Sequence, residues 1–141
     1  PPPAPWAVSC LTLYPVAAWL ALTVANTEDP AQRSVTVAAA GGVGPVAAGT
    51  LVVALSGGVL LALLSVGWGV AAAPHASAPT VLAGVLAHVA AAGAGTAVGL
   101  LCAQRLVRRV GWSLLTGLVV VIVTAIAVGW IVFVAMLISG R

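Results

Sequence analysis

Charge is what this sequence lacks most. Its 141 residues include no lysine, five arginines and two acidic residues, so that only 5% of the chain is charged whereas 62% is apolar. Soluble domains carry roughly 25% charged residues and need polar groups over much of their surface. The shortage excludes a soluble monomer, and the high apolar content excludes a disordered chain. We therefore expect an integral membrane protein.

The missing lysine and the scarcity of acids also restrict the chemistry. A Gly-rich phosphate-binding loop needs a lysine, so this chain cannot hydrolyse nucleotides with one. Glu28 and Asp29 are adjacent and have no nearby His, and neither His stands at metal-ligand spacing from a Cys or an acid. We expect no catalytic residue, no metal and no cofactor. An enzyme is therefore not predicted, and nucleic acid is not among the expected partners.

Four apolar stretches without Asp, Glu, Lys or Arg are each long enough to cross a bilayer, which takes about 20 helical residues. They cover residues 6–25, 45–72, 80–103 and 112–138. None shows the alternation of apolar and polar residues that a barrel strand requires. The sequence predicts an all-α fold in which residues 1–141 form one domain of four transmembrane helices with short loops.

The first loop is predicted to contain a short amphipathic helix over residues 30–40. Asp29 can cap it, Pro30 suits its first position, Gln32 stands where a capping box has Glu or Gln, and Gly41 with Gly42 ends it. Helical spacing separates an apolar face from a polar face containing Gln32, Arg33 and Thr36; the apolar face consists of Ala31, Val35, Ala38 and Ala39. Such a helix lies in the membrane plane or docks on a partner.

The arginines predict the orientation. Arg33 and the trio Arg105, Arg108 and Arg109 lie in the first and third loops, and only Arg141 lies on the other side. By the positive-inside rule, loops 26–45 and 104–111 are cytoplasmic, and both ends of this chain lie on the outer side of the cell membrane. We interpret the trio as a topology and lipid anchor, with a docking site for a cytoplasmic partner as the alternative. The start PPPAPW, without Met, suggests a piece of a longer protein with an earlier span.

Small residues recur every four positions in the third span, where they allow another helix to approach closely. They are Ala91, Gly95, Gly99 and Ala103, and the second span has a similar series at Ala54, Gly58 and Ala62. Packing within the subunit is the favoured interpretation, and a dimer seam is the alternative.

His88 is the ionisable side chain well inside a span. Such groups often serve as proton relays or substrate contacts. Because no span contains a carboxylate partner, we favour a neutral imidazole that is hydrogen-bonded to a Ser or Thr of another helix. Among the tryptophans, Trp6, Trp68 and Trp112 fall near span ends, where indoles prefer to lie; Trp19 and Trp130 fall deeper and are interpreted as packing residues.

Two segments resemble a known family. LYPVAAWLALTVANTEDPAQRSVTVAAAGG and GTAVGLLCAQRLVRRVGWSLL are similar to permease subunits of type-two ATP-binding-cassette exporters, in their Ala/Val/Leu-rich actinobacterial form. The resemblance implies six spans, of which this chain matches the second to the fifth. It also implies a coupling helix, here at Glu28, Asp29, Gln32 and Arg33, that contacts a cytoplasmic ATPase subunit, and a second permease subunit in the bilayer. The alternative is a structural or accessory four-span protein of a larger complex.

Overall fold

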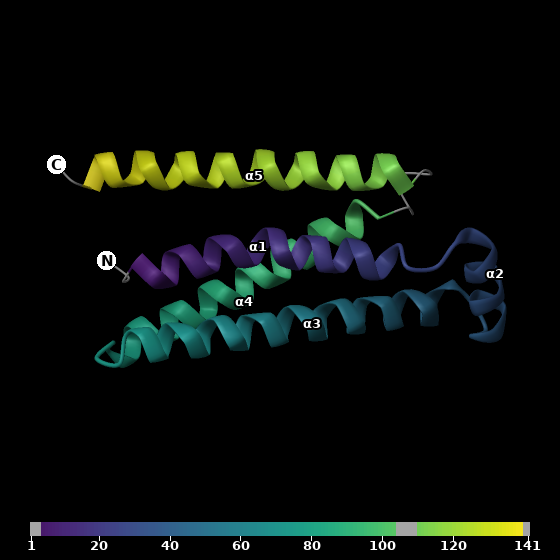
Figure 1. The fold of residues 1–141 in the computed structure, drawn as a ribbon, viewed down its shortest axis with the longest axis horizontal. Coiled ribbons are helices and arrows are strands. Elements are labelled where there is room, and N and C mark those ends of the chain that lie inside the picture. Colours follow the sequence, from purple (N-terminus) through teal and green to yellow (C-terminus); the bar gives the residue numbers. More distant parts are fainter. Residues whose placement is uncertain (1–3, 104–109, 140–141) are drawn as a thin grey trace.

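The computed structural model describes residues 4–103 and 110–139, and these residues form five helices without a strand. The helices are α1 (Ala4–Ala25), α2 (Pro30–Ala39), α3 (Val43–Ala72), α4 (Ala78–Leu101) and α5 (Val110–Ser139). Four of them are long and run along the molecule, whereas the short α2 lies at one end (Figure 1). The prediction of an all-α chain with a short helix in the first loop is confirmed in this part of the chain.

Within the described residues, three helices are long and apolar enough to cross a membrane: residues Trp6–Ala25 of α1, the whole of α3 and the whole of α4. In α5 the described side chains form a shorter apolar stretch, Leu115–Ala127, so the fourth predicted span stays a prediction. Three of the four predicted spans are thus present as candidate spans. Their bounds lie within two residues of those predicted at every end that the structure describes.

The chain runs up and down through the bundle. α1 begins and α5 ends at the same end of the molecule, and α2 makes the turn between α1 and α3 at the opposite end (Figure 1). α4 runs obliquely from the α3 side towards α5. Large apolar side chains remain exposed along the helices, for example Leu63 (65%) and Leu64 (64%) of α3. A surface of this kind is compatible with lipid and would aggregate in water.

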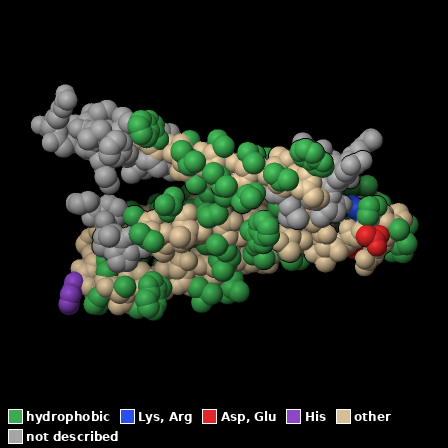
Figure 2. All heavy atoms as spheres, turned by 45° about the horizontal axis from the view of Figure 1, so that its top comes forward, with side chains coloured by type: hydrophobic (Ala, Val, Ile, Leu, Met, Phe, Trp, Pro, Cys, Tyr) green, Lys and Arg blue, Asp and Glu red, His purple; other side chains and the backbone are tan. Residues whose placement is uncertain are grey.

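The core is built mainly from small side chains. On α1 the buried positions are Trp6 near its start and then Leu13, Ala17, Ala18, Ala21 and Leu22, which follow helical spacing along one face. Two buried clusters join this face to its neighbours. One contains Leu13, Ala62 and Ala92, and the other contains Leu22, Cys102 and Ala103. The acidic and basic side chains coloured in Figure 2 lie together at one end of the molecule, and a histidine lies at the other end.

The small residues of α4 lie against α1. A side chain on Gly95 would collide with the carbonyl oxygen of Tyr14, and one on Gly99 would collide with that of Ala18. Ala91 is partly buried against the first core cluster. On α3, Gly58 faces Thr96 and Ala92 of α4, at 3.2 Å and 3.8 Å from the position of an added Cβ. These positions therefore lie in contacts between helices of one chain.

Candidate functional site

Helix α2 begins where a local capping signal places it. Asp29 has an extended backbone, and one of its carboxylate oxygens accepts hydrogen bonds from the amides of Ala31 (2.7 Å) and Gln32 (2.9 Å). Pro30 occupies the first turn, where its missing N–H costs nothing. The second acid also supports this helix, because the Thr36 hydroxyl donates to Glu28 Oε1 at 3.0 Å. Both carboxylates thus hold the start of α2 in place.

The other end of α2 closes with a Schellman motif. The Gly42 amide donates to the Val37 carbonyl at 2.9 Å, and the Gly41 amide donates to the Ala38 carbonyl at 3.3 Å. Gly41 and Gly42 have φ angles of 76° and 147°, which other residues rarely adopt. Helix α2 is therefore fixed at both ends, and only Ala40, Gly41 and Gly42 separate it from α3.

No residue of α2 is buried, and its most exposed face is the apolar one. Val35 is 68% exposed. Ala31, Ala38 and Ala39 are exposed with it, whereas Arg33, Thr36 and Val37 are only partly exposed. Gln32 also remains exposed. The α2 end thus presents an apolar strip beside the few charged side chains of the described part of the chain (Figure 2).

Arg105, Arg108 and Arg109, interpreted above as a lipid and topology anchor, lie outside the described residues. Their interpretation stays a prediction.

His88 is completely buried, and hydrogen bonds engage both of its ring nitrogens. Nδ1 lies 2.7 Å from the carbonyl oxygen of Gly84, and Nε2 lies 3.0 Å from Ser9 Oγ on α1. A carbonyl only accepts, so Nδ1 carries the proton, and in the neutral ring Nε2 can only accept from Ser9. The single hydroxyl proton of Ser9 is shared between two acceptors, His88 Nε2 at 3.0 Å and the Trp6 carbonyl of its own helix at 3.2 Å. His88 therefore has the cross-helix hydroxyl partner that the sequence predicted.

The interpretation of Trp19 and Trp130 as packing residues was wrong, whereas Trp6 lies at the end of a candidate span, as expected, and is buried there. Trp6 is 3% exposed and lies edge-on to His88, with ring centroids 6.0 Å apart, because Gly69 and Gly84 leave room for its indole. Trp19 and Trp130 are 52% and 66% exposed. Neither Trp19 nor Trp130 therefore lies in the core. Depth along a span does not determine which face of the helix a residue occupies.

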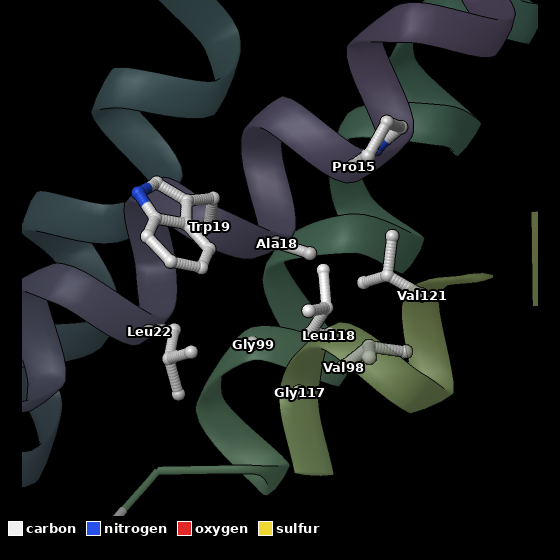
Figure 3. A pocket seen from close by; sticks show the side chains of 9 residues that line it. All are labelled: Pro15, Ala18, Trp19, Leu22, Val98, Gly99, Gly117, Leu118 and Val121. Carbon is white, nitrogen blue, oxygen red and sulfur yellow. The ribbon is translucent and has the colours of Figure 1, made fainter. Parts of the chain in front are cut away.

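Two cavities lie between α1, α4 and α5. The smaller has a volume of about 90 Å³ and a wholly apolar lining that includes Trp19, Leu22, Gly99 and Leu118 (Figure 3). The larger, of about 600 Å³, lies nearer the start of α1. Sequence reasoning missed both. The available signal was the second row of small residues on α4, since Ala83, Gly84, Ala87, Ala91 and Ala94 line the larger cavity.

A hydrogen bond between α1 and α5 borders the larger cavity. Tyr14 Oη lies 2.7 Å from Thr124 Oγ1, and the Thr124 hydroxyl donates to the Val120 carbonyl at 2.7 Å. Because that hydroxyl has a single proton, Tyr14 is the donor to Thr124. Cys10 also lines this cavity, and its thiol donates to the Ala87 carbonyl at 3.4 Å. The cavity wall is thus mainly apolar. Cys10, Tyr14, His88 and Thr124 bond to other side chains or to backbone carbonyls, whereas the buried indole Nε1 of Trp6 has no hydrogen-bond partner among the described residues.

Comparison of the chain with protein-family models, curated proteins and solved structures gives no match. The arguments about function below therefore depend on the residues themselves.

Proposed function

We propose that this chain is a membrane-spanning permease subunit of an ATP-driven exporter. In this proposal α1, α3, α4 and α5 are four spans, loops 26–45 and 104–111 face the cytoplasm of a cell whose plasma membrane holds the protein, and both ends of the chain lie outside. ATP hydrolysis takes place on a separate subunit, in accordance with the absence of lysine here. A second permease subunit completes the transport path.

The observation that carries the proposal is the construction of α2. It is capped at both ends, it stands at the end of the bundle, and short links join it to two long apolar helices. Its apolar strip is exposed beside Gln32 and Arg33. A rigid element of this kind suits contact with a cytoplasmic subunit. A displacement of α2 would be transmitted to α1 and α3 through short links and would not be absorbed by a long flexible loop.

Site-specific photo-cross-linking tests the proposed contact. A benzoylphenylalanine residue replaces Val35, exposed on α2, or His75, exposed in the turn at the opposite end between α3 and α4. In native membranes we expect position 35 to capture a protein that contains a Lys-bearing phosphate-binding loop, and position 75 not to capture it. Capture of that protein equally from both positions, or from neither, would contradict the proposal and favour the accessory role.

Charge changes that preserve the caps test the polar part of the contact. Asn at position 29 keeps an N-cap acceptor and Gln at position 28 keeps an acceptor for Thr36, so Glu28→Gln with Asp29→Asn removes both charges from a folded α2. Combined with Arg33→Glu, these substitutions should abolish co-purification of the ATPase. The matched control is Arg33→Gln alone, which should weaken the association less. Unchanged association and ATPase rate in the triple variant would show that this cluster has no coupling role.

A further inference from the structure

The larger cavity between α1, α4 and α5 is shaped by the sequence of α4. That helix contributes Ala83, Gly84, Ala87, Ala91 and Ala94 to the wall, and these side chains leave a concave surface. The facing wall of α1 contains the bulky Trp6, Leu11 and Tyr14. The volume of the cavity, about 600 Å³, falls within the roughly 300–1,000 Å³ typical of small-molecule sites.

The chemistry of this wall selects an uncharged occupant. Among the described residues that line the cavity there is no Asp, Glu, Lys or Arg. The imidazole of His88 is held by Gly84 and Ser9, and the Tyr14 hydroxyl donates its proton to Thr124. A charged or strongly polar molecule would lose its hydration here and find little in exchange. A hydrocarbon chain has no hydrogen bonds to water to lose, and it gains dispersion contacts along the wall.

The cavity opens sideways at membrane depth. Leu11, Ala83, Ala87 and Ala94 line it and are exposed, so the cavity is open to its surroundings. Leu11 lies seven residues after the start of α1 and Ala87 nine after the start of α4, or about 10 Å and 13 Å along the helices at 1.5 Å per residue. At that depth the surrounding medium is acyl chains, which begin within a few ångströms of a span's end.

We propose that this cavity is a lipid site, occupied by one acyl chain of a membrane phospholipid that lies between α5 and the α1–α4 pair. The chain fills the space that the small residues of α4 leave open, and it contacts the ring of Trp6 at the end of the cavity. The site is separate from the contact proposed for α2, and it does not require transport.

Trp6 provides an internal probe, because a tryptophan is quenched by a brominated acyl chain only at contact. The other four tryptophans, at positions 19, 68, 112 and 130, are all more than half exposed and can be replaced by Phe. The resulting chain, with Trp6 alone, is reconstituted into phosphatidylcholine vesicles with or without bromine on the acyl chains. Although Trp6 is 3% exposed, we expect it to lose most of its fluorescence in the brominated vesicles.

Cavity-filling substitutions make the test specific. Ala87→Leu and Ala94→Leu place a larger side chain in the cavity and should each restore most of the Trp6 fluorescence; Ala90→Leu, on the exposed surface of the same helix and outside the lining, should restore none. Helix content by circular dichroism shows which variants fold, and either cavity variant suffices. The proposal is overturned if, in brominated vesicles, Trp6 keeps its fluorescence while the chain with all five tryptophans is quenched. That result is expected if a second protein helix, and not lipid, covers the cavity. The proposal is equally overturned if quenching persists in both cavity variants.

Discussion

Helices α4 and α5 are both strongly apolar, yet they pack against α1 in different ways. α4 approaches the α1 backbone through Gly95 and Gly99, where no side chain would fit. α5 meets α1 through Gly117, opposite the end of the flexible Leu22 side chain, and through the Tyr14–Thr124 hydrogen bond. Its exposed surface consists of large side chains, among them Val119, Val123 and Ile126. The difference shows that inside a bilayer close packing depends on small residues, since hydrophobicity alone does not favour one apolar neighbour over another.

The largest effect should come from breaking the closer of the two contacts. In Gly99→Leu the new side chain meets the carbonyl of Ala18, which cannot move without displacing α1. We expect a loss of about 3 kcal/mol or more in the free energy of unfolding, at the upper end of overpacking costs. Unfolding by dodecyl sulfate in detergent micelles measures it. In Gly117→Leu the added Cβ lies 3.0 Å from Leu22 Cδ2, the end of a flexible side chain, and 3.6 Å from Cys102 Cβ, so this variant should cost clearly less.

Gly93→Leu is the matched control on α4, because a side chain there meets nothing within 4 Å. It should leave stability almost unchanged. If Gly93→Leu destabilised the protein as much as Gly99→Leu, the loss would stem from leucine in α4 in general, and the argument from close approach would fail.

The polar contact between α1 and α4 should have the next largest effect. Ser9→Ala removes the partner of His88 Nε2 inside a fully buried site. An unpaired buried acceptor costs about 1–3 kcal/mol, and we expect about 2 kcal/mol by the same unfolding measurement. Ser56→Ala is the control, since that hydroxyl is exposed and bonds within its own helix to the Val53 carbonyl. Equal stability of the two variants would mean that Ser9 contributes nothing to the α1–α4 contact.

The α2 helix depends on its caps and not on buried packing. Removing a cap should therefore destabilise the protein less than the substitutions between α1 and α4. Asp29→Ala removes the acceptor for the amides of Ala31 and Gln32, at a cost of about 1 kcal/mol. Hydrogen exchange at these two amides should accelerate while exchange in α4 stays unchanged. Asp29→Asn should restore the slow exchange, and a similar acceleration in both variants would argue that charge, and not the cap, stabilises α2.

The smallest effect is expected at the contact of α5. Tyr14→Phe removes the hydrogen bond to Thr124, and hydrogen bonds between membrane helices contribute on average about 0.6 kcal/mol. A loss of that size, well below that of Gly99→Leu, would sharpen the contrast between the two helices. A loss as large as that of Gly99→Leu would show that α5 depends on this bond far more than its open packing indicates.

Features with local causes could be predicted from the sequence. The bounds of α1, α3 and α4 follow from apolar runs of the right length, and α2 follows from Asp29, Pro30 and the pair Gly41–Gly42. Each of these signals acts within a few residues, so no knowledge of the tertiary contacts is needed.

Features that depend on which helix faces meet could not be predicted. Trp6 lies at a span end, as expected, but its burial was not predicted, because Gly69 and Gly84 of two other helices accept its ring. The larger cavity has the same origin: Ala87 and Ala91 are small on any face, and only the placement of Leu11 and Thr124 opposite them creates a cavity. Such coincidences between distant segments carry no periodic signature.

The Schellman turn at Gly41 and Gly42 has a mechanical consequence. Three residues separate α2 from α3, and the amides of Gly41 and Gly42 are hydrogen-bonded back to α2, so the joint is short and held on its α2 side. Helix α3 rises 1.5 Å per residue and therefore extends about 45 Å from that joint. If α3 tilts with α2 by a few degrees, the far end of α3 moves by several ångströms because of its length.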